Sequence, residues 1–80
     1  MDLALRTLAG LPLGVVVRIV SIATDAATRR YLLAVGLREG DTAEVLRRAL
    51  FGGPLHVRAE CGAEFAIAKA IAEQVQVEAS

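Results

Sequence analysis

The chain has 80 residues, of which 55% are hydrophobic and 4% aromatic, so it can bury one small aliphatic core but is too short for a second domain. Nine basic and nine acidic residues give a formal net charge of zero. This balance argues against a nucleic-acid binder, because such proteins use a strong positive field to attract phosphate. We therefore expect one folded domain over residues 1–80 and no nucleic-acid partner.

The cysteine content and the hydropathy bear on location. Cys61 is the only cysteine and cannot form an internal disulfide, whereas a secreted domain of this size normally needs several. A reducing cytoplasm is therefore expected. No segment has the roughly 20 uncharged apolar residues of a membrane span, so we expect no direct membrane insertion. A surface without net charge opposes self-association only weakly, which leaves a homo-oligomer open.

The first half of the chain predicts a strand followed by a helix. Residues 15–22 form a run rich in β-branched side chains, which is typical of a strand. Thr24 and Asp25 can each accept a hydrogen bond from a free backbone N–H group, as helix N-caps do. Gly36 suits the left-handed conformation that ends many helices. We expect the helix over residues 26–35.

The second half predicts four short strands and one helical turn. The strands are expected over 42–48 and 55–60, around Phe65 and Ile67, and around Val75 and Val77, with the helical turn over 68–73. Pairing Ala59 with Phe65 requires a three-residue loop at 61–63 and places Glu60 opposite Glu64. The predicted fold is mainly β: a small, SH3-like, partly open barrel of five strands, with one helix between the first two strands and a helical turn before the last.

No group of residues predicts an enzyme. His56 and Cys61 are the only histidine and cysteine, and an extended strand would separate them by roughly 16 Å, too far for a nucleophile and its base. Residues 36–40 begin and end with glycine but lack the lysine of a phosphate-binding loop, and Gly52 and Gly53 run into a proline. We therefore expect a binding protein.

One local cluster is a candidate metal site. Glu60, Cys61 and Glu64 lie around one predicted hairpin tip. Facing carboxylates repel unless solvent or a cation screens them, and a thiol adds a soft ligand suited to a divalent transition metal such as iron or zinc. An ordinary solvated hairpin tip is the alternative, and we favour it.

A second candidate site is a partner-docking surface. Leu50 and Phe51 precede a Gly-Gly-Pro turn, where they either close over the core, which we favour, or stand exposed as a docking anchor. Arg47 and Arg48 flank this segment. They could form a basic patch for an acidic partner together with Arg29, Arg30 and Arg58, or all five could be dispersed solubilising charges.

Three segments of the chain, in order and at the right spacing, resemble the FeoA proteins of bacterial ferrous iron uptake. The segments are Leu-Ala-Gly-Leu-Pro-Leu-Gly at 8–14, Arg-Tyr-Leu-Leu-Ala-Val-Gly-Leu-Arg-Glu-Gly at 30–40, and Ala-Leu-Phe-Gly-Gly-Pro-Leu at 49–55. The resemblance implies an SH3-like fold, a cytoplasmic location, and an accessory or regulatory role through binding FeoB, the membrane iron transporter that carries a cytoplasmic GTP-binding domain. The chain departs from the family where Ala68 precedes Lys69, since a basic residue often follows the fourth strand directly.

An alternative function is a transition-metal-binding regulatory domain. The iron-dependent repressors end in a similar SH3-like domain. The 80 residues contain no winged-helix DNA reader, so such a domain would regulate another protein in trans.

Overall fold

The structure is a computed structural model and describes residues 6–80. Its single sheet has six strands in the order β1-β6-β2-β3-β4-β5, and every paired neighbour is antiparallel. The elements are β1 (Arg6–Thr7), the 3-10 turn η1 (Leu8–Gly10), β2 (Val16–Ile22), α1 (Ala26–Val35), β3 (Thr42–Arg48), the 3-10 turn η2 (Leu50–Gly52), β4 (Leu55–Ala59), β5 (Glu64–Ile67), α2 (Lys69–Ala72) and β6 (Val75–Ala79).

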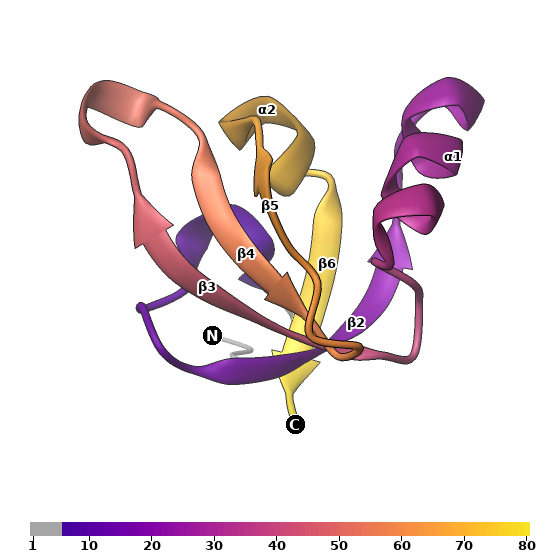
Figure 1. Cartoon of the computed structure of the whole chain (residues 1–80), viewed down its shortest axis with the longest axis horizontal. Helices are drawn as coiled ribbons and strands as arrows, with labels where there is room; N and C mark the ends of the chain where they lie inside the picture. Colours follow the sequence, from indigo (N-terminus) through magenta and orange to yellow (C-terminus); the bar gives the residue numbers. More distant parts are fainter. Residues whose placement is uncertain (1–5) are drawn as a thin grey trace.

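The predicted mainly β architecture is confirmed, with one more strand than expected. The sheet curls into a partly open barrel, with α1 at one side and the β3–β4 hairpin reaching out on the other (Figure 1). The additional strand, β1, has only two residues and pairs with β6. So short a strand carries no alternation of apolar and polar residues, and for that reason the sequence did not indicate it.

The helix α1 has the predicted bounds because both of its ends are set locally. The Asp25 side chain accepts a hydrogen bond from the Thr28 backbone N–H at 3.0 Å, as an N-cap does. Gly36 has a φ of 102° and ends the helix. The Leu37 N–H donates to the Leu32 carbonyl at 2.9 Å, the geometry of a Schellman motif, and both of these leucines are buried.

The core is almost entirely aliphatic. Alternate residues of the strands face it, and η1 and the segment after it close one end with Leu8 and Leu11. The buried residues of the core cluster are Leu8, Leu11, Val17, Ile19, Ile22, Leu32, Leu37, Ala43, Val45, Leu55, Val57, Ile67, Ala72, Val75 and Val77. Phe65 is only partly buried against this cluster. In residues 6–80 no polar or charged residue is buried, so apolar burial stabilises the interior.

The register predicted for the β4–β5 hairpin was wrong by two residues. Val57 pairs with Phe65 and Arg58 with Glu64, so Glu60 does not lie opposite Glu64. The loop has three residues as expected, but they are 60–62. Gly62 explains the difference. A three-residue hairpin loop needs a left-handed residue at its third position, and Gly62 has a φ of 95°. The loop therefore ends at Gly62.

The helices give no candidate for crossing a bilayer: within residues 6–80 none is both long enough and apolar enough to span a membrane.

Candidate partner-docking surface

The loop joining β3 and β4, residues 49–54, is closed tightly by its own backbone. The Ala49 N–H donates to the Pro54 carbonyl at 3.0 Å, and the Gly53 N–H donates to the Leu50 carbonyl at 3.2 Å. A Cβ on Gly53 would lie 2.7 Å from the Ala49 Cβ, so only glycine fits at this position. We call residues 49–54 the η2 loop.

Leu50 and Phe51 project into solvent at the tip of the η2 loop. Their exposed fractions are 80% and 102%, so the expectation that they close over the core was wrong. Strand pairing continues to Arg48 and Leu55, which carries the loop beyond the end of the barrel (Figure 1). No other large apolar residue of 6–80 is as exposed as these two.

The backbone at Phe51 is strained. Its φ is 60°, and among residues 6–80 it is the one non-glycine residue with a positive φ. A left-handed conformation costs a residue with a Cβ about 1–2 kcal/mol. Such strain is concentrated at functional sites, where it holds a side chain in a required position. In the described chain, the strained residue is therefore also the one with the most exposed aromatic ring.

Basic side chains lie at the base of the η2 loop. Arg47 and Arg48 end β3. Arg48 donates hydrogen bonds to the Ala9 carbonyl at 3.0 Å and to the Leu11 carbonyl, which ties the loop to the N-terminal segment. Lys69, the first residue of α2, lies 3.8 Å from the position that a Cβ on Gly52 would occupy. Three basic residues thus surround the neck of the loop.

Two shallow hollows flank this neck. One, of about 280 Å³, is lined by residues that include Arg47, Pro54 and His56. The other, of about 240 Å³, is lined by residues that include Arg48, Gly52 and Lys69. Successive strand residues face opposite sides of a sheet, so Arg47 and Arg48 direct their charges to opposite faces of the hairpin. We call these spaces the Arg47 hollow and the Lys69 hollow.

The wider basic patch considered from the sequence is not assembled. The Arg29 guanidinium lies 3.4 Å from the Glu39 carboxylate. The Arg58 guanidinium lies 3.6 Å from Glu44 and 3.2 Å from Glu64. The charges of Arg29 and Arg58 are therefore balanced within the chain, and only Arg47 and Arg48 of the predicted patch lie beside the η2 loop.

The residues of the candidate metal site are engaged separately. Glu60 Oε1 accepts hydrogen bonds from the Thr42 backbone N–H at 2.9 Å and from its hydroxyl at 3.2 Å. Cys61 is exposed and lies against Gly36. Within residues 6–80 no three side chains of the ligating types converge on one point. Metal binding by Glu60, Cys61 and Glu64 stays a prediction that the β4–β5 register does not support.

Glu64 belongs instead to a charged cluster on the outer face of β4 and β5. His56 Nε2 lies 3.1 Å from Glu64 Oε1, and Arg58 donates to Glu64 Oε2 at 3.2 Å. The hydrogen bond with His56, followed by that from Arg58, holds the pKa of the Glu64 carboxyl below its usual range.

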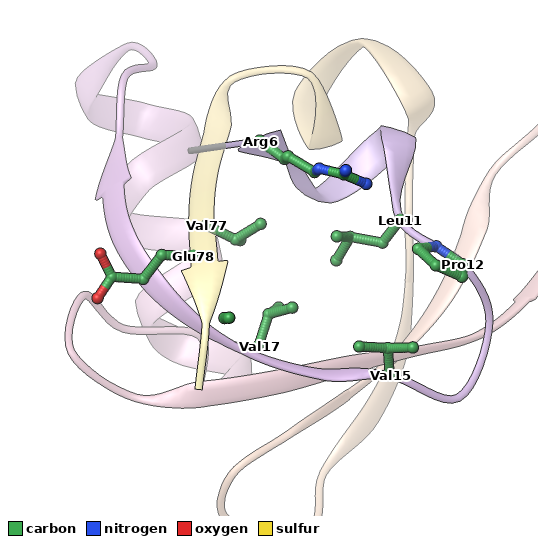
Figure 2. Close-up of a pocket in the computed structure, with 8 residues that line it drawn as sticks. Arg6, Leu11, Pro12, Val15, Val17, Val77 and Glu78 are labelled. Atoms are coloured by element: carbon green, nitrogen blue, oxygen red, sulfur yellow. The ribbon is translucent and has the colours of Figure 1, made fainter. Parts of the chain in front are cut away.

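A third hollow, of about 250 Å³, lies between β2, β6 and the segment that follows η1. Figure 2 shows the side chains of Leu11, Val17 and Val77 turned toward it, with Arg6 lying across one end and Glu78 directed away. Apart from Arg6 and Glu78, the residues that line it are apolar.

Lys69 is the residue of this surface that sequence analysis did not select. It lies 17 positions beyond Gly52 in the chain, and only the packing of α2 brings the two together. The FeoA family often carries a basic residue directly after the fourth strand, where this chain has Ala68 followed by Lys69. That pattern does not say which part of the fold Lys69 contacts.

Comparison with known proteins agrees with this architecture. A family model described as the FeoA domain matches residues 6–79. The solution structure of FeoA from Chlorobium tepidum is 31% identical, with a TM-score of 0.85 over 92% of this chain and 70% of that one. The zinc-complexed crystal structure of FeoA from Stenotrophomonas maltophilia is 29% identical, with a TM-score of 0.74 over 91% of this chain and 89% of that one.

The zinc complex is described as a procaryotic SH3 domain protein and a candidate bacterial ferrous iron transport activating factor, and the likeness to it confirms the SH3-like fold. A manganese-dependent transcriptional repressor shares the fold at 21% identity, with a TM-score of 0.87 over 100% of this chain and 44% of that one. Curated proteins gave no match. Because the family match spans nearly all of the described residues and the fold agrees with it, the chain belongs to the FeoA domain family.

Proposed function

We propose that this protein is a cytoplasmic accessory protein of ferrous iron uptake that binds the transporter FeoB through the η2 loop. The observation that carries the proposal is the full exposure of Leu50 and Phe51 on a loop whose backbone is fixed by its own hydrogen bonds. Membership of the FeoA family supports the pathway, and the zinc-bound relative is described in terms of iron transport activation.

The exposed pair has the properties of an interaction hot spot. A few well-packed side chains at the centre of an interface contribute most of the binding free energy when a partner covers them. A loop already fixed in its bound shape loses little conformational entropy on binding. Phe51 keeps its exposed position at the expense of backbone strain, which a structural role alone does not explain.

Binding to full-length, detergent-solubilised FeoB from the same organism tests the proposal. FeoB is examined nucleotide-free and loaded with GDP or a GTP analogue. We expect Leu50→Ala and Phe51→Ala each to weaken binding at least tenfold, since hot-spot truncations typically cost about 2 kcal/mol.

The matched control is Leu33→Ala. Leu33 lies on α1 and is 47% exposed, so this substitution removes a similar apolar side chain from another surface. It should bind like the wild type. If the wild-type protein binds FeoB in none of the nucleotide states, the proposed function is wrong.

A second candidate function is that of a transition-metal-responsive regulatory domain. A FeoA at 29% identity has been crystallised with zinc, and Cys61 is an exposed thiol of the kind that zinc and iron accept as a ligand. Zinc and ferrous iron are titrated into the wild type and into the Cys61→Ser and Glu60→Gln variants. Stoichiometric binding lost in both variants supports the metal function, and equal uptake by all three proteins contradicts a site at these residues.

A further inference from the structure

We infer that the surface bound by the η2 loop is an apolar protein cleft bordered by carboxylates on both sides. This inference rests on the proposed function, because it specifies the chemistry of the partner at the same loop. Its basis is the placement of positive charge around Leu50 and Phe51 in a chain that has no net charge.

The hairpin end that carries the loop is purely basic. Residues 47–56 include Arg47 and Arg48 and contain no aspartate or glutamate. The packing of α2 adds Lys69 beside Gly52. The acidic residues that bring the net charge of the chain to zero lie elsewhere in the sequence. The surface around Leu50 and Phe51 is therefore locally positive.

These positive charges are not neutralised within the part of the chain that the structure describes. Arg29, Arg38 and Arg58 form ion pairs, but among residues 6–80 no carboxylate lies within 4 Å of the charged groups of Arg47, Arg48 or Lys69. Arg48 donates to neutral backbone carbonyls, which position its guanidinium without cancelling its charge. A partner carboxylate can therefore supply the missing counter-charge.

The two hollows place this charge on both sides of the loop. The Arg47 hollow also includes Ala66 of β5, the Lys69 hollow includes Ala9 of η1, and Arg48 lines both. When Leu50 and Phe51 enter a cleft, the walls of that cleft come against the hollows. Acidic side chains along both walls would meet Arg47 on one side and Lys69 on the other, which fixes the orientation of docking as well as its strength.

A protein cleft fits these features better than an anionic lipid surface does. Basic residues beside an exposed aromatic ring can attract anionic headgroups. Fluid lipid, however, does not need a side chain held in a strained backbone conformation, as Phe51 is. It also does not project side chains into hollows beside the loop. A fixed ring between two recessed basic sites requires a partner of fixed shape.

Charge reversal beside the loop tests the inference. Arg47→Glu and Lys69→Glu are compared with Arg30→Glu, which makes the same change of charge on the exposed surface of α1. Arg48 is left intact because its hydrogen bonds hold the N-terminal segment. Binding to detergent-solubilised FeoB is measured from about 50 to about 300 mM salt, a range over which exposed charges become screened. Thermal unfolding confirms that each variant folds.

We expect each reversal beside the loop to weaken binding about tenfold at low salt, and the two together to remove most of the salt dependence. Arg30→Glu should change the affinity less than twofold. If Arg47→Glu and Lys69→Glu behave like Arg30→Glu while Phe51→Ala still weakens binding at least tenfold, the inferred carboxylate borders are wrong and the proposed function stands.

Two other outcomes overturn the inference together with the proposed function. One is the absence of wild-type binding to FeoB in every nucleotide state. The other is wild-type binding to phosphatidylglycerol vesicles, but not to phosphatidylcholine vesicles or to FeoB, with loss of vesicle binding in Phe51→Ala. That result would assign the loop to the membrane surface.

Discussion

A Cβ placed on Gly36 would lie only 2.9 Å from the sulfur of Cys61. The C-terminal end of α1 therefore packs directly against the loop between β4 and β5, although 25 positions separate the two residues in the sequence. Gly36 thus meets two requirements: its φ of 102° favours glycine, and the space beside it is already occupied.

Alanine substitutions at two glycines separate these requirements. Gly40 has a φ of 91° but nothing lies within 4 Å of its added Cβ, so Gly40→Ala should lower the free energy of unfolding by about 1 kcal/mol through backbone strain alone. Gly36→Ala adds the clash with sulfur and should lower it by about 2–4 kcal/mol. In a Cys61→Ala background the two substitutions should become similar. Urea unfolding measures each value, and equal losses in the wild-type background would argue against the contact.

Removing the strain at Phe51 should stabilise the protein while destroying the docking tip. Glycine adopts a φ of 60° without the penalty that a Cβ brings. Phe51→Gly should therefore raise the free energy of unfolding by about 0.5–1 kcal/mol, whereas Phe51→Ala keeps the strain and should stay near the wild-type value. Both variants should bind FeoB at least tenfold more weakly than the wild type. A Phe51→Gly protein less stable than the wild type would mean that the ring supports the fold.

Two adjacent leucines of α1 test the position of the core. Leu32 is fully buried, and Leu33 is 47% exposed. Leu32→Ala leaves a cavity in the core and should lower the free energy of unfolding by about 2–5 kcal/mol. Leu33→Ala should change it by less than about 0.5 kcal/mol. Circular dichroism during urea titration gives both values, and similar losses would show that α1 packs in another orientation.

The Glu39 carboxylate should make stability depend on pH in the acid range. It accepts a hydrogen bond from the Ile22 backbone N–H at 2.9 Å, and this bond, with the nearby charge of Arg29, lowers the pKa of the Glu39 carboxyl. A folded-state pKa below the unfolded one stabilises the protein above the unfolded value of about 4.3. That stability is lost as the pH falls through the lower folded value.

We therefore expect the free energy of unfolding to fall below about pH 4.3 with a smaller slope in Glu39→Gln than in the wild type. Denaturant titrations from neutral to acid pH provide the comparison. Parallel curves for the two proteins would mean that the bond between Glu39 and Ile22 is absent in solution.

The elements whose ends are set by nearby residues were predictable from the sequence. The helix 26–35 and the strand 42–48 have the predicted bounds, because Asp25 and Gly36 cap the helix through hydrogen bonds within one turn, and apolar and polar residues alternate along the strand. The aliphatic strands and their mainly β arrangement follow from the same local alternation.

The hairpin register and the composition of the docking surface depended on tertiary structure. Alternation shows which residues share a face, but a shift of two residues keeps the same face, so the pattern could not distinguish the observed pairing of Val57 with Phe65 from the one expected. The left-handed Gly62 decided it.

The sequence by itself identified Leu50, Phe51, Arg47 and Arg48 as candidates for docking, because residue type and a glycine-rich turn are local properties. It could not determine whether the two apolar side chains enter the core, since exposure depends on how far strand pairing carries the loop beyond the barrel. It also could not place Lys69 beside Gly52. Contacts between residues that are distant in the sequence arise only when the whole chain packs around one core. That packing placed Lys69 beside the η2 loop.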